Sequence, residues 1–228
     1  EAEHYLFYRG LGTFHLPFEG RALGQGRVRF ENKAAQMVKQ VVTLEVGPEA
    51  KTARYTIHCY VDAGQVVEPD LAARPFGPIE QVLPGLEADV QKILRGSGLH
   101  ADEARAMVRT WSRSWFRSEG LRCIYTVPRE VTDALLPLTI TPAPDHVVRV
   151  LVGRLELIAP ETQAEVEAAL LDTLTTDEAR RARGEARLAR LGRFLEPHLR
   201  NVQGSAHANP AARKQAVARL WALRETER

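Results

Sequence analysis

Four arginines recur at every fourth position within LHADEARAMVRTWSRSWFRSEGLRCIYTV, which covers residues 99–127. On a helix they share one face, where like charges repel by roughly 0.2–0.5 kcal/mol per pair. One interpretation is a solvated face with acidic neighbours. The other is a cationic ridge for a carboxylate-rich or phosphate-rich partner. The ridge consists of Arg105, Arg109, Arg113 and Arg117.

Side chains that could bind a metal ion or act as nucleophile or base are scattered along the chain. The set that a fold could bring together is His58, Cys123, Asp145 and His146. Asp145 and His146 are adjacent, so their side chains diverge and do not form a triad by themselves. A metal or nucleophilic site would require the fold to assemble all four. We therefore predict no catalytic, cofactor-binding or metal site and keep these residues as a candidate polar site.

Sequence motifs of the common enzyme classes are absent. The chain contains no GxxxxGK[ST], HExxH, CxxC or GxSxG. The glycine pairs at 10–12 and 24–26 lie in a β-rich region without a βαβ context, which indicates turns. The basic helices lack the interleaved aromatic residues of a single-strand nucleic-acid groove. These observations favour a non-enzymatic protein and disfavour a nucleic-acid partner.

The element that presents the arginines is a predicted helix that ends at Gly120, followed by a strand over 121–127. Its opposite face carries an apolar stripe that includes Trp111 and Trp115 at helical spacing. Gly120 suits a left-handed helix stop. Residues 121–127 alternate with the period of a strand, and Pro128 ends it. We expect Trp111, in the middle of the stripe, to be fully buried.

The predicted fold class is α+β, with a small β-sandwich-like (Ig-like) N-terminal region. Residues 1–68 form this region, 69–83 a linker, 84–160 a helix–helix–strand–strand core, and 161–228 a helical region packed on that core. Strands are expected at 5–9, 13–18, 27–31, 39–46 and 54–61. Five strands are few for a closed sandwich, so later strands complete it or upstream strands are missing.

The central region should contain a helix that starts near Pro84, an extended edge segment over 135–140 and a covered strand over 147–158.

Composition is that of a globular protein of 228 residues, with 44% hydrophobic and 26% charged residues. No apolar run reaches the length of a membrane span. Residues 176–228 carry a net charge of +6, which would meet an anionic surface or the acidic remainder of the fold.

Arginine outnumbers lysine 26 to 5, so we give single arginines little weight as functional signals. Cys59 and Cys123 are expected to be buried thiols, or a disulfide if their strands are neighbours.

Several segments together resemble the C-terminal part of a family of uncharacterised exported bacterial proteins. They are FYRGLGTF, EARAMVRTWSRSWFRSEGLRCIYTVPR, LLPLTITPAP, VVRVLVGRLELIAP and LGRFLEP. The resemblance covers about residues 5–200 and implies export to the periplasm or cell envelope, with a further β-rich segment upstream. The start at Glu1 rather than Met is consistent with a processed or trimmed chain. The resemblance implies no activity.

The sequence therefore predicts a non-enzymatic exported protein or fragment that acts as a binding or structural module within a larger protein or assembly. The expected partner is another protein or the upstream segment of the same protein, and no cofactor is expected. One alternative is a hydrolase with a site that the sequence does not reveal. The other is binding of a polyanion or anionic surface through the arginine-rich helices.

Overall fold

A five-stranded antiparallel sheet forms the centre of the molecule. The computed structural model describes residues 15–226. The strand order of this sheet is β6 (Gly77–Pro78), β4 (Thr52–Val61), β3 (Val38–Val46), β7 (Gly120–Val127) and β8 (Leu151–Leu157). A second, three-stranded antiparallel sheet has the order β1 (Phe18–Gly24), β2 (Arg27–Asn32) and β5 (Val66–Val67).

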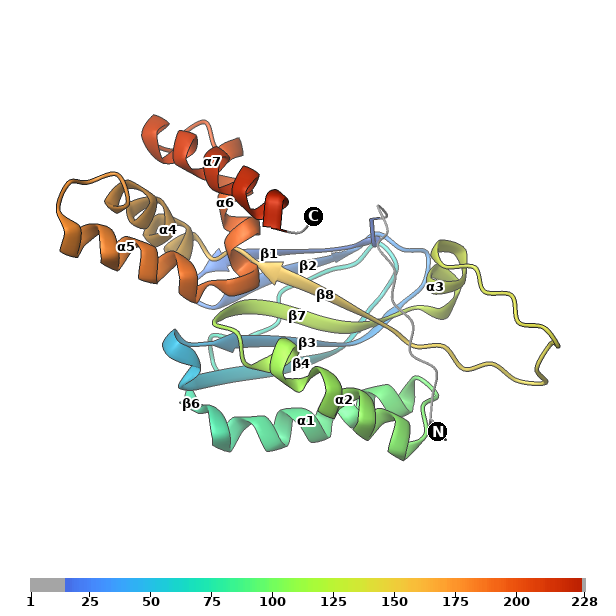
Figure 1. Cartoon of the computed structure of the whole chain (residues 1–228). Helices are drawn as coiled ribbons and strands as arrows, with labels where there is room; N and C mark the ends of the chain where they lie inside the picture. Colours follow the sequence, from blue (N-terminus) through green and yellow to red (C-terminus); the bar gives the residue numbers. More distant parts are fainter. Residues whose placement is uncertain (1–14, 227–228) are drawn as a thin grey trace.

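The five-stranded sheet is covered on both faces, which gives three layers (Figure 1). Helices α1 (Ile79–Gly96) and α2 (Ala101–Phe116) cover one face, and the three-stranded sheet covers the other. Strand β7 shows why the layers form, because its apolar side chains alternate between them. Ile124 packs with the helices, whereas Leu121, Cys123 and Tyr125 pack with the three-stranded sheet.

The C-terminal residues form a separate helical layer with its own apolar core. The helices are α4 (Pro160–Asp172), α5 (Glu178–Arg190), α6 (Leu195–Gly204) and α7 (Pro210–Thr226), with the 3₁₀ turn η2 (Gly192–Phe194) before α6. Leu170, Leu188 and Leu199 are buried at its centre. In Figure 1 this unit lies beside the end of the sheet where β8 leads into α4.

The predicted α+β class is confirmed: the described residues form seven α-helices and two antiparallel sheets. The Ig-like arrangement is not established. The strands before residue 68 divide between the two sheets, and β7 and β8 complete the larger one, so strands from the predicted segments 1–68 and 84–160 share one sheet. The strand predicted at 5–9 lies outside the described residues, and β1 begins at Phe18 rather than 13.

Several local expectations were wrong. Residues 135–140 do not form a strand, because helix α3 (Arg129–Leu135) takes up their start and the rest is irregular. Strand β8 begins only at Leu151. Helix α1 begins at Ile79 and includes Pro84, because its buried face starts with Ile79 and Leu83.

Two burial predictions were also wrong. Cys59 is exposed, because it lies near the end of a strand at the edge of the sheet. Trp111 is only half-buried, at the margin of the apolar stripe, whereas Trp115 is 8% exposed.

The end of α2 is closed by two arginines from the sheet. The last carbonyl groups of an α-helix lack partners within the helix, and this end carries partial negative charge. Arg122 of β7 is fully buried and donates from Nη1 to the Trp115 carbonyl at 3.1 Å and from Nη2 to the Ser118 carbonyl. Arg154 of β8 donates to the Ser114 carbonyl and forms an ion pair with Glu156 at 2.8 Å.

The same corner holds the C-terminal helical unit. The Arg122 guanidinium lies 4.7 Å from the centre of the Phe194 ring. Gly120 has φ +126°, and a Cβ there would lie 3.0 Å from the Phe194 ring, so only glycine allows this approach. Helix α2, strand β7 and the unit that begins with α4 therefore meet around Arg122.

The two tryptophans of α2 should differ in their contribution to stability. Trp115→Ala should lower the free energy of unfolding by about 3–5 kcal/mol, because it empties a buried site. Trp111→Ala should cost about half as much, because less apolar surface is buried there. Urea melts of both variants, followed by circular dichroism, measure this difference. Equal losses would contradict the burial seen here.

Candidate functional site

The structure does not bring the candidate polar residues together. Cys123 is buried between the two sheets, and burial raises the pKa of its thiol. His58 lies on β4, with strand β3 between it and Cys123. Asp145 and His146 are exposed in the irregular segment before β8. Both cysteines are free thiols, and no three His, Cys, Asp or Glu side chains in the described part of the chain could together hold a metal ion.

The arginine ridge is partly neutralised. Arg105 pairs with Asp102 on its own helix, and Arg117 pairs with Glu80 of α1 at 2.6 Å. The Arg117 guanidinium holds the pKa of the Glu80 carboxyl below its usual range. Arg109 and Arg113 are exposed, and neither has an ion-pair partner within residues 15–226.

A shallow depression lies beside the ridge. Its volume is about 650 Å³. It is lined by Thr110, Trp111, Arg113, Ser114, Arg117 and Ser118. Two cations, one indole and three hydroxyl groups would suit an anionic ligand better than a neutral or cationic one.

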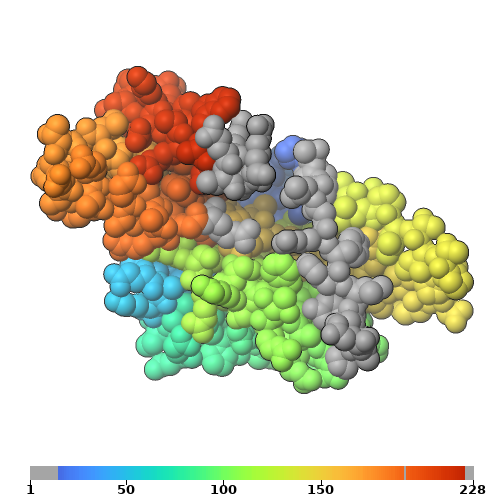
Figure 2. Space-filling model, in the orientation of Figure 1, coloured from blue at the N-terminus to red at the C-terminus, as the bar shows by residue number. Residues whose placement is uncertain are grey.

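The feature that departs most from the compact fold is the segment between α3 and β8. Residues 137–146, hereafter the arm, are ten consecutive exposed residues. Figure 1 shows this segment, in yellow, extending well beyond the sheet, and Figure 2 shows it at the margin of the molecule. From Pro137 to Pro144 the arm has no charged side chain. Leu138 and Ile140 are 47% and 40% exposed.

Ionic and backbone contacts hold the two ends of the arm together. Arg149 is nearly buried and donates to Asp133 of α3 and to the Leu136 carbonyl, both at 2.7 Å. Arg129 of α3 also binds Asp133 and donates to the Val147 carbonyl at 2.9 Å. These arginines, Arg129 first, hold the pKa of Asp133 below its usual range, so its carboxylate is ionised at neutral pH. The arm is therefore a clamped loop rather than a loose connection.

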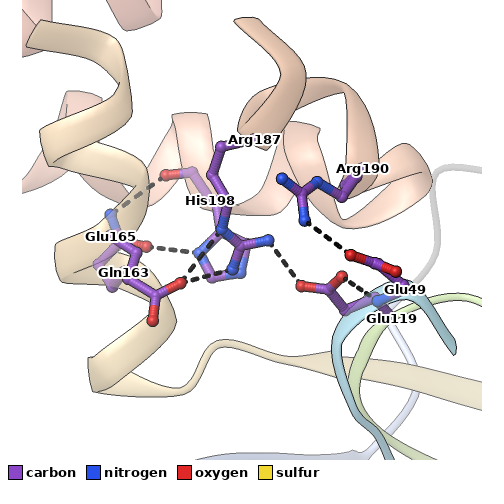
Figure 3. A network of polar contacts seen from close by, with 7 residues as sticks. All are labelled: Glu49, Glu119, Gln163, Glu165, Arg187, Arg190 and His198. Carbon is purple, nitrogen blue, oxygen red and sulfur yellow. Dashed lines mark hydrogen bonds and ion pairs between the residues drawn. The ribbon is translucent and has the colours of Figure 1, made fainter. Parts of the chain in front are cut away.

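A polar network holds the C-terminal unit against the sheet (Figure 3). Arg187 of α5 pairs with Glu119, just before β7, and with Glu165 of α4, each at 2.6 Å. Arg190 approaches Glu49, in the turn between β3 and β4, at 3.8 Å. These contacts bridge separate elements, so we interpret the network as structural.

His198 belongs to this network but is enclosed. It is 2% exposed, and its Nδ1 lies 2.8 Å from Oε1 of Gln163. Burial, and then the nearby Arg187, lowers the pKa of His198 to about 4. The imidazole is therefore neutral at neutral pH and out of reach of a substrate.

Sequence reasoning missed the fully buried Arg122 and the nearly buried Arg149 because single arginines were discounted. Both stand inside apolar runs, Arg122 in LRCIYTV and Arg149 in VVRVLV. A charged residue flanked in this way is buried with its strand and needs partners. The apolar residues on both sides of each arginine were therefore the sequence feature from which its burial could have been predicted.

No family model, curated protein or solved structure matches the chain. Within residues 15–226, no helix has the length and apolar character needed to cross a membrane. The geometry above is therefore the basis for any proposal about function.

His198 should make the protein sensitive to acid. The unfolded chain binds a proton near pH 6.5, whereas the folded chain resists protonation until about pH 4. Stability is therefore full above pH 6.5 and falls as the pH is lowered toward 4, by on the order of 3 kcal/mol. His198→Gln should flatten this part of the pH profile, measured by urea unfolding at a series of pH values. His146→Gln, at an exposed site, is the control and should follow the parent.

Proposed function

We propose that this protein is a binding module that engages another protein through the arm. The observation that carries the proposal is a run of ten exposed residues with an uncharged, partly apolar tip on a clamped base. Surface apolar groups gathered in one place commonly mark an interaction site. The export expected from the sequence resemblance stays a prediction.

The contacts of Arg129 and Arg149 that clamp the base of the arm affect binding affinity, because a segment that binds a partner must become ordered. Each side chain or loop that becomes immobile reduces affinity, and a segment already held in place loses less entropy. Here Arg149 and Asp133 fix the base, and Pro137, Pro142 and Pro144 restrict the backbone of the tip. The arm is thus prepared for recognition in an extended form, as in peptide segments that bind grooves or strand edges.

The chemical character of the arm limits the class of molecule that can bind it. An uncharged tip gains little from a polyanion and most from an apolar groove or an open strand edge. A folded protein offers such surfaces, so we propose a protein partner for this site.

The test removes the apolar character of the arm tip. A variant with Leu138→Ser and Ile140→Ser should lose partner binding by at least about tenfold, because two exposed anchors are gone. The first measurement compares proteins retained by the purified parent and variant from an extract of the native cells. The second is a titration of the identified partner with both forms.

Thr139→Ser, a polar change in the same segment, is the matched control and should bind like the parent. Thermal melts should coincide for all three forms, since the changed residues are exposed. Equal retention of every protein by the parent and the double variant would contradict the proposal.

A second candidate function, anion binding, is favoured by Arg109 and Arg113 beside the depression on α2. Retention on heparin should decrease steeply with salt if these arginines contact a polyanion. Arg109→Gln with Arg113→Gln should elute at lower salt than the parent. Arg105→Gln is the control, because Arg105 is already paired with Asp102. Identical elution of parent and double variant would leave only the solvated-face interpretation.

A further inference from the structure

The outer edge of β4 is open over most of its length. β4 pairs with β3 along the whole strand, but β6 covers only Thr52 and Ala53. Among the described residues, no strand pairs with positions 54–61 on that side. Proteins usually protect such edges with lysine, proline, a bulge or another charge. Arg54, at the start of this stretch, is paired with Glu45 at 2.6 Å. Residues 55–61, YTIHCYV, contain no proline, lysine, arginine or acidic residue.

The exposed end of this edge is neutral and accessible. Cys59 is exposed, and Tyr60 is 57% exposed. In the sheet order and in Figure 1, β4 lies on the side of β3 opposite to β7 and β8. At the two ends of this stretch, the Val61 carbonyl accepts from Asn32 Nδ2 and Arg54 donates to the Ala72 and Arg74 carbonyls. The part of the edge left for another strand is therefore the neutral stretch 55–59.

The arm supplies a segment of that character. Residues 138–141, LTIT, lie between Pro137 and Pro142 and each has a backbone N–H and C=O. Three of the four are β-branched, which favours an extended backbone. The flanking prolines lack N–H groups and restrict any ladder to a few residues.

We propose that residues 138–141 of one copy add as a short strand to the open edge of β4 in a second copy. This inference rests on the proposed function and names the partner of the arm. The same chain carries both elements, and neither residues 55–61 nor residues 138–141 contain a lysine, arginine or acidic residue to oppose the contact. The clamp directs the arm away from β4 of its own chain (Figure 1), which favours addition to another copy. Reciprocal exchange about a two-fold axis closes the assembly as a dimer.

Sedimentation velocity of the full chain over a concentration series tests the association. The parent should shift from monomer to dimer within the millimolar range. Ile140→Lys in the arm and Tyr60→Lys on the edge should each weaken the dimer at least about tenfold, because each places an unpaired charge in the contact. Leu174→Lys, at a site that is 52% exposed in the helical unit, is the matched control and should dimerise like the parent.

Cross-linking to the native Cys59 tests the contact itself. Single cysteines at positions 138, 139, 140 and 141 are oxidised with diamide, which takes up the two electrons and two protons released by each thiol pair. Side chains of neighbouring strands lie within disulfide range only on a shared face. Positions two residues apart on that face lie about 7–8 Å from a diagonal partner, beyond disulfide range. One of the four positions, the one opposite Cys59, should therefore form disulfide-linked dimers, and its immediate neighbours should not. Cys59→Ser should abolish them, and His146→Cys, equally exposed but outside the segment, should not form them.

The outcomes separate this inference from the proposed function. A parent that stays monomeric, or a dimer in which no position among 138–141 links selectively to Cys59, overturns the inference. If the arm variant then still loses a different protein partner, the proposed function stands alone. If neither self-association nor partner binding depends on the arm, both proposals fail.

Discussion

The rest of the structure depends on the buried guanidinium groups of Arg122 and Arg154 at the end of α2. A buried charge persists only where hydrogen bonds and opposite charge compensate for lost water. Here the compensation comes from carbonyl groups at the helix end, from Glu156 and from the Phe194 ring. One corner therefore joins the helical layer, the sheet and the C-terminal unit, since each contributes a group that the others need.

This corner explains the role of β7 in the fold. β7 lies between β3 and β8, and its side chains reach both apolar layers. The contacts of Arg187 and Arg190 then hold the C-terminal helices to the sheet near the same place. We call the sheets, α1, α2 and the C-terminal helices that these contacts join the frame. Because it shares so many contacts, the frame resists local opening. Functional segments are commonly loops positioned by such a rigid scaffold.

The arm and the frame follow opposite physical rules. Around Arg122 and Arg154, charged groups are shielded from solvent and compensated, whereas in the arm apolar groups are exposed and charges lie only at the base. Asp133 and Arg149 fix the direction of the arm without contributing to its tip. Separation of a polar clamp from an apolar tip lets the tip be extended without being part of the core. Residues 55–61 of β4, like the tip of the arm, carry no lysine, arginine or acidic side chain, although they belong to a regular strand.

The sequence by itself determined the elements with strong periodicity and clear stops. The stripe of α2 and the alternation of β7 were predictable because local geometry imposes their spacing. The predicted helix stop at Gly120 was wrong, because α2 ends at Phe116 and Gly120 is the first residue of β7. Tertiary structure alone decided which strands share a sheet, because pairing partners such as Val42 and Ile124 are far apart in the chain. Tertiary structure also decided how far side chains at the borders of the apolar core are exposed. Cys59 lies on an open strand edge, and Trp111 lies at the limit of the surface that α2 buries. Within the arm, residues 138–141 have the β-branched composition of a strand. The prolines on either side limit that stretch to four residues, and no described strand pairs with it, so it is a loop.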